Sequence, residues 1–200
     1  MGCDIHLYME VYNEDKWVDA NLYEINEYYK EYSGCSEERM EFLPIPPYRN
    51  RNYELFGIFA GVRNQIMKPI SPARGIPEDV TSKIEANFIR LDSDAHSSSW
   101  LTLAEIKDYQ ENHKYVKRKG YVSPEVAARV AAGGEKPDSW CGRTNREDWV
   151  EIEWEDKLKC IDWFVESVEQ YIKVKFQWNH VINEYLKNPE KVRFVFWFDN

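Results

Sequence analysis

Two short stretches place an acidic residue two positions before a histidine: Asp4-Ile5-His6 and Asp94-Ala95-His96. Residues two positions apart on a β-strand project from the same face, so each pair could act as one chemical group. Together the pairs supply carboxylates and imidazoles, which are used in acid–base catalysis and in metal sites of the His/carboxylate type. Taken singly, such a pair more often forms a simple hydrogen bond. We therefore expect no metal and no other cofactor.

A second set of candidate residues is basic. Arg49, Arg51, Arg63 and Arg74 lie in segments that are otherwise apolar or rich in Pro and Gly. Guanidinium groups suit the two-point capture of phosphate or carboxylate. A structural role is the alternative, because Arg63 follows an expected helix and could bond to its last carbonyl groups.

Aromatic residues accompany these polar groups at Tyr48, Tyr53 and Trp100. A nucleotide base stacked on such a ring gains about 1–3 kcal/mol. Ordinary core packing is the competing explanation in a chain with 15% aromatic residues. Cys3 alternates onto the apolar side of the first strand, so we expect it to pack rather than react.

The elements that position these residues can be read from periodicity. From Cys3 to Val11 apolar and polar residues alternate, which predicts a half-buried strand, and Lys16–Asp19 predicts its hairpin partner. The closing KVRFVFWFDN is apolar on both faces and predicts a central strand. We expect the N-terminal and C-terminal strands to share one sheet.

Helices are expected where apolar residues recur every three or four positions or where capping signals occur. They are predicted at 53–62, after Thr81 or Ser82, after Thr102, after Ser123-Pro124, and over about 155–187 as one long amphipathic helix or two with a kink. Pro69–Val80 contains three prolines and a glycine and predicts an ordered loop. The expected fold is therefore α+β: a single domain over 1–200 with a mixed or antiparallel sheet, helices packed on it and long functional loops. Variable excursions are expected at about 21–47 and 107–150.

Bulk properties narrow the function classes. The 200 residues include 35 acidic and 26 basic side chains, a net charge of −9 that disfavours binding to nucleic-acid polymers. The four cysteines are widely spaced, no signal peptide is recognisable, and no apolar run reaches the length of a membrane span. We expect a soluble, cytoplasmic protein with reduced thiols and no membrane contact.

Five blocks of the chain resemble a functionally uncharacterised family common in bacteriophage genomes. These are MGCDIH, RNYELFGIFAGVRN, ISPARGIPEDV, HSSSWLTLAEI and VRFVFWFDN. The family blocks typically read GCDIH, RNY-LF-LAGVRN, ISPPRGLP, HSHSWLTL and VFWFDN. Ala73 stands where proline is usual, and Ser98 stands where a second histidine is frequent, which weakens a metal-site interpretation. The resemblance implies that the protein is located in the cytoplasm of an infected host cell. It implies no established activity.

The polar residues within these blocks predict one ligand site. Its expected members are Asp4, His6, Arg51, Asn52, Tyr53, Arg63, Asn64, Arg74, His96, Ser97 and Trp100. Arginines would hold phosphate, aromatic rings a base, and Asp4 ribose hydroxyls or base amino groups. The resemblance is to phage proteins, and the predicted nucleotide pocket comes without a Walker loop, a GxGxxG or a kinase motif. We therefore expect a phage anti-defence protein. It would sequester a small phosphorylated nucleotide-like immune signal.

Two other functions stay open at this stage. A phosphodiesterase would use His6 and His96 as acid and base, with Asp4 orienting His6. His96-Ser97-Ser98 matches one His-x-Ser/Thr unit of two-histidine phosphoesterases, whereas His6-Leu7-Tyr8 does not. A protein-binding or inhibitor function could use the Tyr-rich segment Tyr23–Tyr32. Whether the protein is an enzyme, and whether it forms a homo-oligomer, is open.

Overall fold

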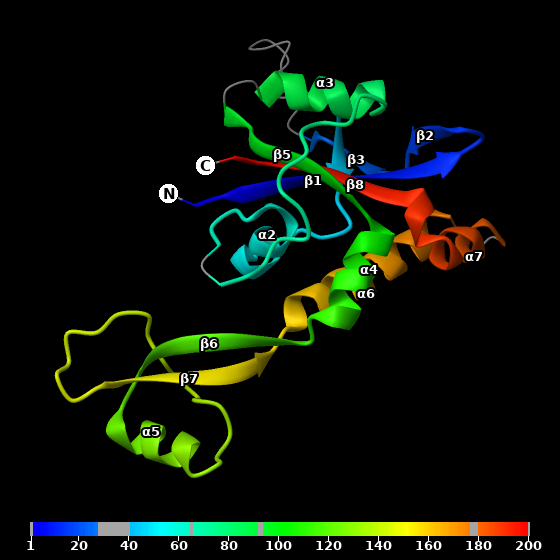
Figure 1. Ribbon diagram of the computed structural model, residues 1–200. Helices are drawn as coiled ribbons and strands as arrows, with labels where there is room; N and C mark the ends of the chain where they lie inside the picture. The colour runs from blue at the N-terminus through cyan, green and yellow to red at the C-terminus, as the bar shows by residue number, and fades with distance from the viewer. Residues whose placement is uncertain (1, 28–40, 65, 92–93, 177–179, 200) are drawn as a thin grey trace. The chain divides into compact units, whose positions relative to one another are not determined.

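The last strand of the chain, β8 (Val192–Asp199), lies between β1 (Asp4–Asn13) and β5 (His96–Thr102) in the computed structural model (Figure 1). The structure describes residues 2–27, 41–64, 66–91, 94–176 and 180–199. The fold is α+β, as expected, and its paired strands are antiparallel. The other strands are β2 (Lys16–Asp19), β3 (Leu22–Ile25), β4 (Phe42–Ile45), β6 (Tyr115–Val122) and β7 (Val150–Lys157). The helices are α2 (Tyr53–Ala60), α3 (Ser82–Leu91), α4 (Leu103–Asn112), α5 (Pro124–Ala131), α6 (Lys159–Lys175), α7 (His180–Lys187) and the 3-10 turn η2 (Pro189–Lys191).

The chain divides into two compact units. The sheet unit comprises Met1–Gln110 and Cys160–Asn200, and the hairpin unit comprises Glu111–Lys159. The central sheet of the first unit has the strand order β2-β1-β8-β5. The predicted pairing of the N-terminal and C-terminal strands is confirmed by a register that runs from Asp4 opposite Asp199 to Val11 opposite Val192. The prediction of a single domain stays a prediction.

One face of the central sheet packs against helices α2 and α6. Phe194, Phe196 and Phe198 of β8 point to this face, because alternate residues of a strand project to the same side. Phe59 of α2 lies 5.3 Å from Phe196, and Phe164 of α6 lies 5.3 Å from Phe194, measured between ring centroids. This aromatic layer is fully buried.

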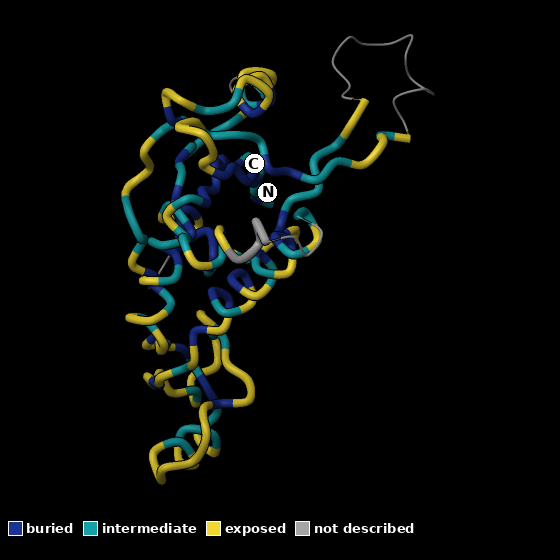
Figure 2. The backbone as a smooth tube through the Cα atoms, turned by 90° about the vertical axis from the view of Figure 1, so that its right-hand side faces the viewer, coloured by how far each residue is buried: buried dark blue, intermediate teal, exposed yellow. Residues whose placement is uncertain are grey.

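The opposite face is covered by α3, so the sheet is the middle layer of the unit (Figures 1 and 2). Ile84 of α3 packs with Tyr8, Val195 and Trp197, and all four are buried. The prediction that β1 is half-buried is therefore wrong. Tyr8 and Glu10, on its expected polar side, are buried beneath α3 and the loop before it.

Local signals account for the boundaries of several helices. The Asn52 side chain caps α2 by accepting hydrogen bonds from the amides of Glu54 and Leu55, and Gly61 ends it in the left-handed conformation. The predicted capping box at α4 is formed, since Thr102 and Glu105 bond reciprocally to each other's backbone amides. The Ser123 hydroxyl caps α5 by accepting a hydrogen bond from the Val126 amide.

The helix expected over about 155–187 begins later than the sequence suggests. Val150–Lys157 forms strand β7, and the helical part consists of α6 from Lys159 and a separate α7. The letters VEIEWEDK alternate apolar and acidic residues, which is a strand pattern. No helix in the described part of the chain is long and apolar enough to cross a membrane.

The hairpin unit is built on the β6–β7 ladder. On one face of it Lys117 is opposite Glu155 and Lys119 is opposite Glu153. At Gly120 the chain passes beneath the ring of Trp140, and a side chain there would meet this ring. The ion pair between Arg118 and Asp156 and the packing of Trp140 over Gly120 hold the unit together.

The Tyr-rich segment proposed as an interaction surface falls largely outside the described residues, which resume at residue 41. Its first member, Tyr23, makes internal contacts. The Tyr23 hydroxyl donates to Asp19 at 2.6 Å, and the Lys83 ammonium lies 3.3 Å from its ring centroid. Tyr23 therefore stabilises the sheet unit itself.

Candidate functional site

Several of the predicted site residues meet at one end of the central sheet, where β1 begins and β8 ends (Figure 1). We call this group the terminal cluster and define it by six residues: Asp4, His6, Arg51, Tyr53, Arg63 and Asp199. Four separate segments contribute to it. They are the two terminal strands, the residues that lead into and begin α2, and the turn after α2.

Asp4 and Arg51 form a two-point ion pair within the terminal cluster. The Arg51 Nε atom donates to Asp4 Oδ1 at 2.8 Å, and its Nη2 atom donates to the other carboxylate oxygen. This contact holds the pKa of Asp4 below its usual value. The pair is exposed on the surface, so a ligand anion can compete with Asp4 for the guanidinium group.

His6 pairs with Asp199, a residue that we did not predict as part of the site. His6 Nε2 lies 3.2 Å from Asp199 Oδ2, and the imidazole stacks on Trp197 with ring planes 12° apart. Both side chains of the pair are 32% exposed. The predicted role of Asp4 as the carboxylate that orients His6 is thus taken by Asp199, because Asp4 faces Arg51.

Arg63 lies over the thiol of Cys3. Burial raises the pKa of the Cys3 thiol, and the hydrogen bond and charge of Arg63 only partly oppose this effect. Cys3 is 1% exposed, as its expected packing role requires. Arg63 itself has a backbone φ of 51°, a left-handed conformation that is uncommon for a residue with a side chain.

Tyr53 supplies an exposed aromatic ring to the terminal cluster. Its side chain is 41% exposed and packs edge-on against Phe56 with the ring centroids 5.7 Å apart. The contact with Asp4 is the main cause that raises the pKa of Arg51, and the nearby Tyr53 hydroxyl adds to it. A ring ligand held by Arg51 would therefore have an aromatic neighbour.

His96 and Ser97 do not join His6. His96 is in register with Phe198, whereas His6 is in register with the adjacent residue Trp197, so β8 separates the two histidines and their rings lie on opposite faces of the sheet. His96 stacks on Phe198, and its Nδ1 atom contacts the Ser97 hydroxyl at 3.1 Å. The two-histidine arrangement that would make His6 and His96 an acid–base pair is therefore not formed.

Asn52 and Asn64 have structural partners. Asn52 caps α2. Asn64 closes the turn after α2 by accepting from the Ile66 and Met67 amides and donating to the Met67 carbonyl, and its side chain lies against Gly57. Both side chains use their hydrogen-bonding groups to shape the two loops that carry Arg51 and Arg63.

Arg74, in the loop over 69–80, contacts Trp100 of β5 away from the terminal cluster. The Arg74 guanidinium lies 4.7 Å from the Trp100 ring centroid and forms an ion pair with Glu105 of α4 at 2.5 Å. The Arg74 amide also donates to the Ser99 hydroxyl. These contacts fasten the loop over 69–80 to the edge strand, so Arg74 and Trp100 act as anchors of that loop.

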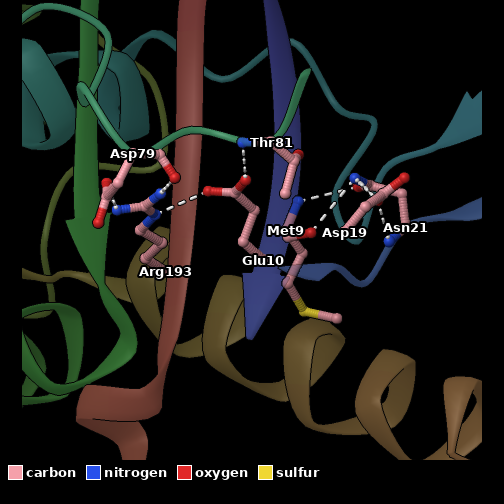
Figure 3. Close-up of polar contacts among 7 residues, drawn as sticks. All are labelled: Met9, Glu10, Asp19, Asn21, Asp79, Thr81 and Arg193. Atoms are coloured by element: carbon pink, nitrogen blue, oxygen red, sulfur yellow. Dashed lines mark hydrogen bonds and ion pairs between the residues drawn. The ribbon is translucent and has the colours of Figure 1, made fainter. Parts of the chain in front are cut away.

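A buried ion network fastens the other end of the same loop (Figure 3). Arg193 Nε donates to Glu10 at 2.7 Å, and its Nη1 donates to Asp79 at 2.6 Å. The second Glu10 oxygen accepts from the Thr81 amide at 2.8 Å. The side chains of Glu10 and Arg193 are 0% and 3% exposed. The network therefore connects the central sheet with the segment that leads into α3.

These missed residues had weak sequence signals. Arg193 is the one charge in the run VRFVFWF, and a charge in a buried strand requires a partner. The identity of that partner depends on register, which a single sequence does not provide. The same is true of Asp199, whose contact with His6 spans 193 positions.

The chemistry of the terminal cluster is mixed rather than purely basic. It offers two guanidinium groups, two carboxylates that face each other across β1 and β8, one imidazole and one exposed phenol ring. Among the described residues, no group of three or more His, Cys, Asp or Glu side chains is arranged to hold a metal ion. Guanidinium groups complement anions, and carboxylates complement hydroxyl or amino donors, so the cluster presents both kinds of hydrogen-bonding group.

Comparisons with protein-family models, with curated proteins and with solved structures found no match, and the resemblance to the bacteriophage family stays a prediction.

Proposed function

We propose that the protein binds a small phosphorylated, nucleotide-like ligand at the terminal cluster. The observation that carries this proposal is the meeting of Arg51, Arg63, Tyr53 and His6 with two carboxylates at one end of the sheet. Guanidinium groups would take the phosphate, Asp4 and Asp199 would accept hydrogen bonds from ribose hydroxyls or base amino groups, and Tyr53 would stack on the base.

The internal pairing of the cluster defines which ligand it favours. Arg51 is already bonded to Asp4, so a simple anion must displace a carboxylate and leave it unpaired. A ligand with both phosphate and donor groups can bond to Arg51 and to the released Asp4 at the same time. This favours a nucleotide over inorganic phosphate.

The biological setting of the proposal rests on the resemblance to bacteriophage proteins. A phage-encoded protein that captures a nucleotide immune signal would lower its free concentration and protect the infecting phage. Capture of the signal at the terminal cluster is the step that this proposal requires.

The experiment that tests the proposal is ligand depletion. The purified protein is mixed with a panel of cyclic dinucleotides and ADP-ribose, the protein is removed by filtration, and the filtrate is analysed by chromatography. We expect one compound of the panel to be depleted from the filtrate, with at least one molecule removed per protein chain. Depletion of none of the compounds would refute the proposal.

A matched pair of variants locates the binding site. Arg51→Gln removes the guanidinium of the cluster, whereas Arg49→Gln removes a nearby arginine whose exposed partner is Glu24. We expect Arg51→Gln to weaken depletion at least tenfold and Arg49→Gln to leave it unchanged, with both melting temperatures close to that of the parent protein. Equal effects of the two variants would place the ligand elsewhere.

A further inference from the structure

His6 and Asp199 have the geometry of an acid–base pair. Their positions in the sequence do not predict this contact. Asp199 Oδ2 lies 3.2 Å from His6 Nε2, and stacking on Trp197 fixes the plane of the imidazole ring. If Nε2 carries the proton that Asp199 accepts, Nδ1 holds the free lone pair. No described residue forms a hydrogen bond with Nδ1, and about one third of the His6 side chain is exposed. A substrate can therefore reach the basic nitrogen.

We infer that His6 is a general base for hydrolysis of a phosphodiester or pyrophosphate bond, with Asp199 as its positioning residue. This inference rests on the proposed function, because the bond to be cleaved belongs to the nucleotide-like ligand of the terminal cluster. Asp4 lies two residues before His6 on the same strand and holds Arg51 beside it. In the inferred reaction, Arg51 would stabilise the extra negative charge of a five-coordinate phosphorus.

The reaction consumes one water molecule. Nδ1 of His6 takes a proton from water while the water oxygen forms a bond to phosphorus. The bond from phosphorus to the leaving oxygen breaks with its electron pair, and that oxygen takes a proton from solvent. The resulting imidazolium is stabilised by the Asp199 carboxylate and then releases its proton to solvent, which restores the pair.

Turnover and capture are separated in one assay. The protein is incubated with the same panel of cyclic dinucleotides and ADP-ribose at a hundredfold excess of compound over protein, and products are followed over time. We expect more than one product molecule per protein chain. Recovery of the bound compound intact overturns the inference but leaves the binding proposal standing, whereas no depletion of any compound overturns both.

Variants assign the role of each residue. We expect His6→Gln to lower the rate of product formation at least 100-fold at saturating compound, because a general base contributes about 10²- to 10⁴-fold. His113→Gln, in the hairpin unit, is the matched histidine control and should retain the full rate. A rate in His6→Gln equal to that of the parent protein overturns the inference.

Two variants test the positioning role of Asp199. Asp199→Asn keeps the shape of the side chain but removes its charge, and it should lower kcat at saturating compound at least tenfold. Asp199→Glu keeps the charge and should restore part of kcat. An unchanged kcat in Asp199→Asn, or a loss in Asp199→Glu as large as in Asp199→Asn, would overturn the assigned role.

Discussion

At the scale of single residues, Arg193 shows how a charge is kept within an apolar strand. Its guanidinium is 3% exposed, bonded to Glu10 and Asp79, and 4.2 Å from the Trp17 ring centroid. A buried charge is tolerated when hydrogen bonds and an opposite charge replace its water shell. The polar positions of the family-like blocks are therefore partly explained by structure alone.

The first prediction concerns this buried pair. Arg193→Met leaves Glu10 buried without its cation, and breaking a buried pair in this way costs about 3–5 kcal/mol of unfolding free energy. Urea denaturation followed by tryptophan fluorescence measures the loss. Arg49→Met, which breaks an exposed pair with Glu24, is the control and should cost about 1 kcal/mol or less. Equal losses in the two variants would contradict the buried-network interpretation.

The second prediction concerns pH and the pair Arg74–Glu105. Burial alone would raise the pKa of Glu105, but Arg74 and the Thr102 amide outweigh it and hold the pKa below its ordinary value of 4.5. A carboxyl group whose pKa is lower in the folded state stabilises the fold above its unfolded pKa. That stabilisation is complete above pH 4.5 and disappears as pH falls through the folded-state value.

Comparison with Arg74→Gln measures this effect. In the variant, carbon-detected NMR titration should show the pKa of Glu105 higher than in the parent protein. The difference in unfolding free energy between the two proteins should be present at pH 7 and shrink below pH 4.5. A difference that is independent of pH would show that Arg74 stabilises the loop through its contact with Trp100 instead.

At the scale of elements, α2 carries a third prediction. Asn52, a predicted member of the ligand site, caps this helix with its side-chain oxygen. Asn52→Ala should lower the unfolding free energy by about 1 kcal/mol, and Asn52→Asp should retain most of it, because Asp caps helices equally well. Thermal melting of both variants measures the effect. Two equal losses would mean that capping is not the role of Asn52.

Local patterns predicted elements well where a boundary signal was present. The alternation in β1, the asparagine before α2, the capping box of α4 and the Ser-Pro start of α5 all act within a few residues. The structure confirms each of these elements. Such signals are readable because the interactions that they report are between sequence neighbours.

Elements were missed where one stretch of sequence fits both a strand and a helix, or where contacts with distant residues determine the structure. The polar end of β7, Glu155-Asp156-Lys157, is equally compatible with the first turn of the amphipathic helix that follows, so the predicted helix begins within the strand. The β4 strand contains Pro44, which disfavours a strand interior but is tolerated in a two-stranded sheet. The burial of Glu10 depends on α3, more than 70 positions away.

At the scale of the whole molecule, the position of β8 gives a fourth prediction. Strand β8 is bonded on both sides, and its residues from Val192 to Phe198 are buried (Figure 2). The amides of β8 should exchange with solvent only when the sheet unit unfolds. The amides of the two-stranded sheet formed by β3 and β4 should exchange through local opening. Hydrogen exchange with mass spectrometry compares the peptides. Faster exchange in β8 than in β4 would contradict its central position.

The candidate site was only partly predictable, because its contacts join residues that are far apart in the sequence. Side-chain type identified Asp4, His6, Arg51 and Arg63 as candidates, and the structure brings these four to the terminal cluster. Their partners lie 47 positions away for Asp4 and 193 positions away for His6. Only the strand register decides that His6 meets Asp199 and that His96 lies on the other face of the sheet.

The central place of β8 also determines the order of events during synthesis on the ribosome. Strand β1 is synthesised about 190 positions before β8, its main partner in the sheet. Until then its apolar face and the aromatic residues of α2 have no sheet to cover. An uncovered apolar strand of this kind is prone to non-specific association until its partner strand has been made.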